Sequence, residues 1–278
     1  MEHTSTTSPS VTGRVAQTLL AFNGAGRWQG VSELARELGL SKSVVHRILQ
    51  QLVQTGLVRY DTTRRAYALG PASVALGMRA SAEDDLRAAA MPAISKLAEV
   101  TGETTTLSAR IGYRRCYVAQ IESMQRIRIT VSIGEHTPLT VGASGICMLA
   151  QLPSEQVNDV LSLPIPSLTP RTPTDPEVLR NRLESIKEQG WATTRSEHVP
   201  LSQGIAAPIT NADGLPAGSL SIGFLASRLE GQAIDKYAAL VVEAAKRASQ
   251  AYQRRLTEAE YGTETHGRTS AHDPTGAG

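Results

Sequence analysis

Arg47 and Gln50 stand three residues apart in a segment that is otherwise rich in aliphatic residues. Each can form a pair of hydrogen bonds with the edge of a base in the major groove of duplex DNA. Four more polar residues stand beside them: Ser41, Lys42, Ser43 and His46. The first two would begin a helix, where backbone N–H groups and an ammonium group suit a phosphate. The set predicts a surface that contacts DNA; the alternative is the solvated face of an ordinary helical hairpin.

A helix-turn-helix would position these side chains, and its pattern is present in residues 32–58, SELARELGLSKSVVHRILQQLVQTGLV. Apolar residues repeat at helical spacing on both sides of Gly39, where a left-handed residue would end the first helix. They are Leu34, Ala35 and Leu38 before the glycine, and Val45, Ile48, Leu49 and Leu52 after it. Ser41 is a suitable N-cap for the second helix. With the apolar residues inward, the polar residues point outward or lie at the flank.

A short hairpin follows this segment. Residues 57–70, LVRYDTTRRAYALG, alternate apolar and polar residues on both sides of a turn, which predicts two strands. Arg64 and Arg65 lie at or beside the turn, and a basic hairpin after such a helix indicates a wing that contacts DNA. Residues 10–70 carry eight Lys or Arg and three acidic residues, hence +5, in a chain of net charge +2. A basic module on a slightly acidic body is typical of proteins that bind duplex DNA.

The composition is that of a folded protein. The chain has 278 residues, of which 41% are hydrophobic, so it can form two packed domains and is not disordered. Aromatic residues make up 4%, which disfavours a platform for stacking single-stranded bases. No run of about 18 apolar residues is present, and residues 1–10 are polar, so we expect no membrane span and no signal peptide. The protein should be cytoplasmic, with reduced thiols.

Changes in periodicity divide the chain. Beyond residue 103 helical and strand patterns mix without strict βαβ alternation, which predicts an α+β fold for the second half. Three early strands are expected at 104–110, 114–121 and 126–133. The predicted parts are a disordered tail at 1–9, a winged helix-turn-helix domain at 10–71, an Ala-rich linker helix at 72–91, a second domain at 92–256 and a disordered tail at 257–278.

Several motifs occur in the order and spacing of one family. TGETTTLSAR begins at Thr101, VGASGICMLAQLP at Val141 and GIAAPITNADGLPAGSLSIG at Gly204. Together with the helix-turn-helix segment and YALG, they make the chain resemble the IclR family of bacterial transcription regulators over residues 11–255. The resemblance implies a winged helix-turn-helix, a linker helix and a GAF-like α/β domain that binds a small-molecule effector. It also implies homodimers or tetramers that bind double-stranded operator DNA.

The family's effector contacts can be placed on matching positions of this chain. They are Ala143, Ser144, Gly145, Thr194, Gly204, Ser221 and Gly223. The first three would begin a helix, whose free N–H groups favour a carboxylate. Gly145, which has no side chain, would let the anionic end of the ligand approach the backbone. The chain has Ile146-Cys147 where the family often has Lys-Ala. Small residues at three further positions suggest a roomier pocket, for an aromatic or longer acid. Alternatively, Ser144 and Ser221 are a helix cap and a packed strand residue.

Enzymatic and redox functions are the competing classes. A GAF-like domain can carry thiol chemistry, and Cys147 lies near a predicted helix start, which would lower the pKa of its thiol. However, a cysteine in a run such as ICMLA is usually part of a core. The six histidines show no metal spacing and no GxSxG motif is present. The sequence therefore predicts no enzyme, no metal and no cofactor. A DNA-binding redox sensor that uses Cys147 or Cys116 remains the alternative.

Overall fold

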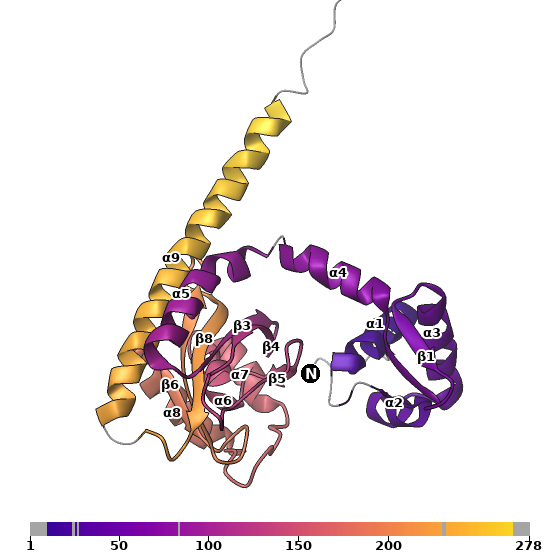
Figure 1. The fold of residues 1–278 in the computed structure, drawn as a ribbon, viewed down its shortest axis with the longest axis horizontal. Helices are drawn as coiled ribbons and strands as arrows, with labels where there is room; N and C mark the ends of the chain where they lie inside the picture. Colours follow the sequence, from indigo (N-terminus) through magenta and orange to yellow (C-terminus); the bar gives the residue numbers. More distant parts are fainter. Residues whose placement is uncertain (1–9, 24–25, 27, 83, 230–231, 269–278) are drawn as a thin grey trace, which may run out of the picture. The chain divides into compact units, whose positions relative to one another are not determined.

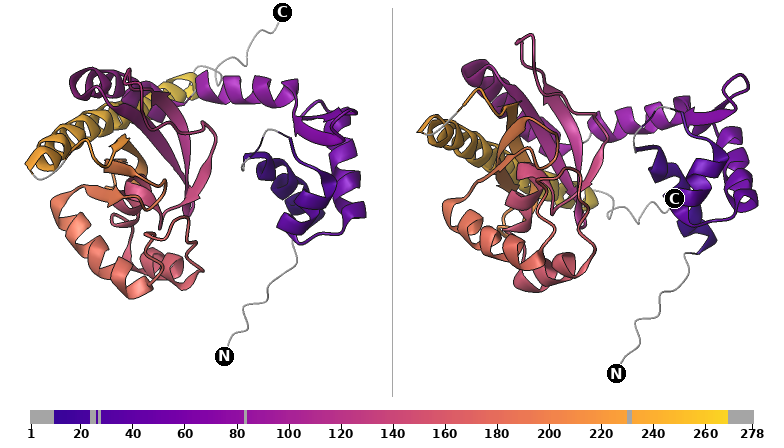
Figure 2. Two further views of the ribbon diagram at one scale, coloured as in Figure 1. Left: turned by 60° about the horizontal axis from the view of Figure 1, so that its bottom comes forward. Right: turned by 90° about the horizontal axis from the view of Figure 1, so that it is seen from below.

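The computed structural model describes residues 10–23, 26, 28–82, 84–229 and 232–268 (Figures 1 and 2). The chain divides into two compact units between residues 83 and 84. The predicted disordered tail at residues 1–9 lies outside the described residues.

The first unit is a helix-turn-helix followed by a hairpin and a further helix. Its elements are α1 (Val11–Leu20), η1 (Ala21–Asn23), α2 (Val31–Leu38), α3 (Lys42–Gln54), β1 (Val58–Asp61), β2 (Ala66–Leu69) and α4 (Pro71–Ala82). Gly39 ends α2 in the left-handed region, with φ +62°, and the Ser41 hydroxyl accepts a hydrogen bond from the Val44 N–H. The predicted apolar residues of α3 are all buried, in one core with Leu34 and Ala35. These details confirm the predicted helix-turn-helix.

The hairpin is confirmed as well. β1 and β2 pair antiparallel with Tyr60 opposite Tyr67, and the backbone of Tyr67 also pairs with Gln29 on its other side. Gly70 ends the hairpin at a point where the chain crosses itself closely. A Cβ there would lie 2.2 Å from the carbonyl oxygen of Gly56, so only glycine fits without movement. This contact joins the end of the hairpin to the end of α3.

The predicted linker helix at 72–91 is two separate helices in the structure. α4 ends at Ala82, and α5 (Asp85–Thr101) begins after Asp84, whose side chain accepts a hydrogen bond from the Arg87 N–H. Leu86, Ala89 and Ala90 of α5 are buried, and the first and last of them join the core of the second unit. The second unit therefore begins before residue 92, where the sequence placed the start of the second domain. The aspartate cap and the continuous apolar spacing set the start of α5, and Pro92 lies inside the helix.

The second unit is built on one antiparallel sheet of six strands in the order β5-β4-β3-β8-β7-β6. The strands are β3 (Thr104–Ile111), β4 (Arg114–Ile121), β5 (His136–Pro138), β6 (Ala192–Arg195), β7 (Ser202–Thr210) and β8 (Pro216–Leu225). One face is covered by α5 and α9 (Gln232–Arg268), and the other by α6 (Gly142–Leu149), as Figure 1 shows. α7 (Ser154–Ser162) and α8 (Pro176–Gln189) pack around α6.

Each face of the sheet has its own apolar core. Strand alternation assigns the residues of β7, because Ile205 packs with α5 and α9 whereas its neighbour Ala206 packs with α6 and α8. α6 is enclosed entirely, and every one of its residues is buried. The predicted α+β fold of this half is confirmed by these layers.

One predicted strand is wrong. Residues 126–133, all of which the structure describes, form part of an irregular loop between β4 and β5. The free edge of β4 pairs with residues 134–138 instead, beginning with the hydrogen bond from the Gly134 N–H to the Tyr117 carbonyl, 2.8 Å long. Side chains hold the loop, as in the 2.7 Å hydrogen bond from the Val131 N–H to Gln120 Oε1. Residues 126–133 therefore do not pair with β4, although their apolar and polar residues alternate as in a strand.

The end of the chain also differs from the prediction. α9 continues to Arg268, where a disordered tail was expected from residue 257; residues 269–278 lie outside the described part. Polar residues do not oppose the extension of a helix that already exists, since each added residue gains one hydrogen bond. Within the described residues, no helix is both long and apolar enough to cross a membrane.

Candidate functional site

The exposed face of α3 gathers the residues that the sequence singled out. Ser41, Lys42, Ser43, His46, Arg47 and Gln50 are all exposed, whereas the residues between them are buried or partly buried. Ser41 is partly engaged, because its hydroxyl caps the helix and lies 3.1 Å from the hydroxyl of Ser43. The other side chains are presented to solvent along the first two turns of α3. The spacing of the helix thus gives a polar ridge with two cationic groups.

The predicted wing residues differ from one another. The guanidinium of Arg64 pairs with Asp61 at 2.9 Å, and it lies over the ring of Trp28, 5.4 Å from its centroid. Arg59 lies over the same ring at 4.9 Å. Arg65 makes neither contact and holds a left-handed backbone at the turn, with φ +50°. The sequence interpretation missed Trp28 and Arg59, although the alternation of β1 already placed Arg59 on the polar side.

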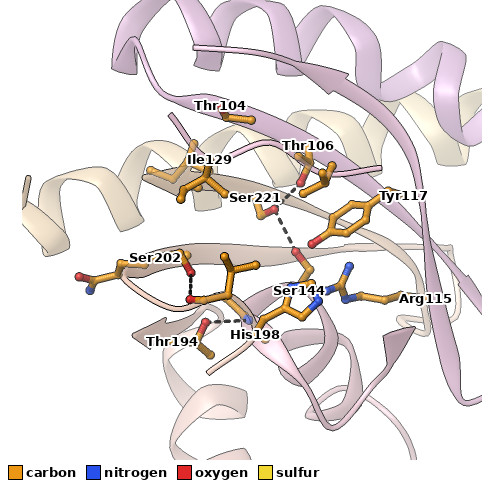
Figure 3. Close-up of a pocket in the computed structure, with 18 residues that line it drawn as sticks. Thr104, Thr106, Arg115, Tyr117, Ile129, Ser144, Thr194, His198, Ser202 and Ser221 are labelled. Atoms are coloured by element: carbon orange, nitrogen blue, oxygen red, sulfur yellow. Dashed lines mark hydrogen bonds between the residues drawn. The ribbon is translucent and has the colours of Figure 1, made fainter. Parts of the chain in front are cut away.

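The second unit contains a small cavity between the sheet and the start of α6 (Figure 3). Its volume is about 60 Å³, and the loop between β4 and β5 contributes Ile129 and Val131 to its wall. Six of the seven predicted effector residues line it: Ala143, Ser144, Thr194, Gly204, Ser221 and Gly223. Four elements, α6, β6, β7 and β8, therefore bring the predicted residues together.

A chain of hydroxyl groups crosses the floor of the cavity (Figure 3). Ser144 donates to the hydroxyl of Ser221 at 2.9 Å, and Ser221 shares a hydrogen bond of 2.7 Å with Thr106. The Ala143 N–H donates to the hydroxyl of Thr194 at 3.1 Å. This N–H is therefore not free for a ligand, contrary to the expectation of bare groups at the helix start. The serines tie α6 to β8 and also line the cavity. Ser144 is not the expected helix cap, because the N-cap of α6 is Val141 and no side chain caps this helix.

Gly145, the seventh predicted residue, faces away from the cavity. A Cβ on Gly145 would lie 2.7 Å from the carbonyl oxygen of Leu139 and 3.0 Å from its carbonyl carbon. The glycine thus lets α6 pack against the backbone that precedes it. One residue along a helix turns the side-chain direction by about 100°, which separates this position from Ser144.

The expected roomier pocket is also absent from the described structure. Small residues do line the cavity, but other groups fill the space they leave. A Cβ at Gly204 would meet Ala143 Cβ at 3.5 Å, and one at Gly223 would meet Ile129 Cγ2 at 3.6 Å. The cavity is consequently far below the roughly 300–1,000 Å³ of sites for drug-sized ligands. The sequence did not show that the loop after β4 would occupy this space.

The sequence interpretation also missed Arg115. This side chain lines the cavity and is only 1% exposed. Its Nε and Nη1 have no hydrogen-bond partner among the described residues. The guanidinium carbon lies 4.3 Å from the centroid of the Tyr117 ring. Strand alternation could have found it, because Arg115 and Tyr117 share the face of β4 that lines the cavity, whereas Arg114 is exposed.

An ion pair lies beside the cavity. His198 Nε2 is 3.5 Å from Glu135 Oε1, and the hydrogen bond from His198 holds the pKa of Glu135 below its usual value. The charge of Arg115 also lowers that pKa. Glu135 is thus ionised near neutral pH and already has a partner.

Both cysteines are buried, and Cys147 lies in the apolar core around α6. Burial raises the pKa of Cys147 to about 12, and it also raises the pKa of Cys116. Since the thiolate is the reactive form, neither cysteine is activated near neutral pH. This environment speaks against the redox-sensor alternative and against thiol catalysis.

Comparison with known sequences identifies both units. The family model of the IclR helix-turn-helix domain matches residues 11–62, and that of the bacterial transcriptional regulator IclR C-terminal domain matches residues 78–250. The chain belongs to the IclR family. Proteins of the IclR family are DNA-binding transcriptional regulators and not enzymes, and this chain is a regulator of the same kind.

Individual IclR proteins match this chain along most of their length. The HTH-type transcriptional regulator KdgR of Escherichia coli K12 is 30% identical over 232 residues, which are 83% of this chain and 88% of KdgR. The crystal structure of an IclR regulator from Alicyclobacillus acidocaldarius matches with a TM-score of 0.76 at 28% identity, covering 87% of this chain and 98% of that one. An IclR homolog from Microbacterium hydrocarbonoxydans, complexed with 4-hydroxybenzoate, matches with 0.69 at 23% identity, over 88% and 100% of the chains, and shows the same fold.

Proposed function

We propose that this chain is a cytoplasmic regulator whose affinity for operator DNA changes when a small carboxylate binds in the cavity beside α6. The observation that carries the proposal is the cavity itself. It is small, it combines hydroxyl groups with apolar side chains, and it is lined by six residues at the positions where the resemblance places effector contacts. A DNA-binding unit joined to such a sensor unit is the arrangement of a ligand-controlled regulator.

In this proposal α3 enters the major groove. Arg47 and Gln50 read base edges, and Lys42 contacts a phosphate near the start of the helix. Arg65 supplies the main charge of the wing, because Arg64 is partly neutralised by Asp61. The exposed face of α3 supports these roles.

Substitutions in α3 test the DNA contacts. Arg47→Ala should cost about 1–3 kcal/mol of operator affinity and relax the preference at one base pair, because a paired contact with a base is lost. Lys42→Ala should weaken binding to all sequences alike and reduce the slope of affinity against salt by about one. Fluorescence anisotropy with operator and scrambled duplexes over a salt series measures both.

Gln54→Ala, at the far end of α3, is the control and should leave both quantities unchanged. If Arg47→Ala bound the operator with normal affinity and preference, the assignment of Arg47 to base reading would be wrong.

The size of the effector follows from the loop after β4. With Ile129 against Gly223, the cavity admits an acid of only a few carbons. A larger ring, such as the 4-hydroxybenzoate held by the homologous structure, would require the loop to move. We therefore propose a short-chain carboxylate, with an aromatic acid as the second candidate.

We also propose that the regulator acts as a symmetric dimer, because one recognition helix reads too short a site. α4 presents apolar side chains to solvent: Val74, Leu76 and Met78 are 59%, 62% and 69% exposed. Exposed apolar groups on one short helix indicate a surface that another protein covers. A second copy of α4 fits, since it would carry the same apolar surface and would pair two recognition helices. Pairing of dimers would give the tetramer.

Charge placed on this surface tests the dimer. Val74→Glu with Met78→Glu should shift the protein from dimer to monomer in sedimentation, because carboxylates would be forced into an apolar contact. Operator affinity should fall with it. Val11→Glu, at a residue of α1 that is 74% exposed, is the matched control and should sediment like the wild type. A wild-type monomer at micromolar concentration with full operator affinity would contradict the proposal.

A further inference from the structure

We infer that Arg115 selects the effector by pairing with its carboxylate, an inference that rests on the proposed function and names the group that recognises the acid. The cavity would then take its anion specificity from β4 and not from the start of α6.

The first support is the burial of an unpartnered charge. Arg115 is 1% exposed, and its Nε and Nη1 donate no hydrogen bond to any described residue. Buried polar groups almost always have partners, and an unpaired buried charge is costly. A side chain that keeps two enclosed donors unpartnered against this cost indicates an acceptor supplied from outside the chain.

The second support is that the neighbouring groups leave these donors open. Within the described parts of the chain, no carboxylate forms an ion pair with Arg115; the nearby Glu135 is paired with His198. The guanidinium carbon of Arg115 lies over the Tyr117 ring, 4.3 Å from the ring centroid. This cation–π contact is not a hydrogen bond to Nε or Nη1, which still have no acceptor.

The third support is the position of the side chain. Arg115 lines the same cavity as Ser144 and Ser221, and Figure 3 shows its guanidinium directed toward the start of α6. Nη2 lies at the start of α6, where a Cβ on Gly142 would be 3.5 Å from it. A guanidinium binds a carboxylate through two parallel hydrogen bonds, from Nη2 together with Nε or Nη1, and a neutral amide cannot reproduce this pair. The hydroxyls of the floor are left to contact the rest of the acid.

The competing explanation is structural, in which the cation over Tyr117 holds β4 in place. The two explanations predict opposite signs for one measurement. If Arg115 binds a ligand carboxylate, its buried charge is unpaired in the ligand-free protein and lowers the stability. Removing that charge should then raise the melting temperature of the ligand-free protein. If Arg115 is structural, the same change should lower the melting temperature.

The test uses the full chain with Arg115→Met, and with Arg114→Met as the control. Arg114 is the exposed neighbour on the same strand. Melting temperatures are measured without additive, then with acetate, propionate and benzoate, and with the corresponding amides. Calorimetry then measures the affinity for the acid that stabilises most. Operator binding by the wild type, measured alongside, tests the proposed function separately.

We expect at least one acid, and none of the amides, to stabilise the wild type and Arg114→Met. Arg115→Met should bind that acid at least about thirtyfold more weakly and, when ligand-free, should melt at a higher temperature than the wild type. The inference is overturned if ligand-free Arg115→Met does not melt higher, if acids stabilise it as they do the wild type, if amides act like acids, or if no acid stabilises the wild type.

Discussion

Replacing Gly145 by leucine should destabilise the second unit by about 3 kcal/mol or more, rather than abolish the effector response alone. The Cβ of any larger residue would lie 2.7 Å from the carbonyl oxygen of Leu139. That contact is with backbone, which cannot rotate away as a side chain would. α6 is buried along its whole length, so it has no free side toward which it could shift. Urea denaturation followed by circular dichroism measures the loss.

Gly204→Ala is the matched control. Its Cβ would meet Ala143 Cβ at 3.5 Å, an ordinary van der Waals distance, so its stability should change little. A Gly145→Leu protein of normal stability would show that α6 can move away from Leu139. If that protein also lost only its effector response, the position would belong to the pocket after all.

Replacing Arg228 by methionine should cost about 3–5 kcal/mol, because it leaves a buried carboxylate without its cation. The guanidinium pairs with Glu103, whose side chain is 5% exposed. It also donates to the Ile127 carbonyl at 2.7 Å, which ties the loop between β4 and β5 to the end of β8. The loop should therefore loosen as stability falls. Denaturation measures the first effect, and hydrogen exchange of residues 122–135 the second.

Two further variants separate these effects. Arg128→Met breaks an exposed ion pair with Glu122 in the same loop and should cost no more than about 1 kcal/mol. Glu103→Gln combined with Arg228→Met removes both charges and should recover part of the lost stability. Equal losses for Arg228→Met and Arg128→Met would mean that the buried pair contributes no more than the exposed one.

Local patterns carried most of what the sequence revealed. The helix-turn-helix depends on residues within one or two turns of each other, such as the Ser41 cap and the buried stripe from Val45 to Leu52, so periodicity was sufficient. The α+β fold class of the second unit was also predicted. Six of the seven predicted effector residues line one cavity, because the family pattern fixes their positions in the sequence.

What the sequence missed depends on contacts between distant residues. Residues 126–133 alternate like a strand, but the edge of β4 is taken by the residues that follow them. Gly145 was assigned to the ligand, whereas its close neighbour is the backbone of Leu139. Arg115 looked like one more basic residue of a strand, since nothing local shows that its donors would be enclosed and unpaired.

The order of the strands has a consequence for synthesis of the protein. β3 lies between β4 and β8, and the hydrogen bond between Thr106 and Ser221 joins residues 115 positions apart. The contacts of the first unit are local by comparison, and local contacts form quickly. On the ribosome, the winged unit can therefore fold while the cavity still lacks one wall. A nascent or truncated chain that ends before β8 would carry a complete recognition helix with no sensor to control it.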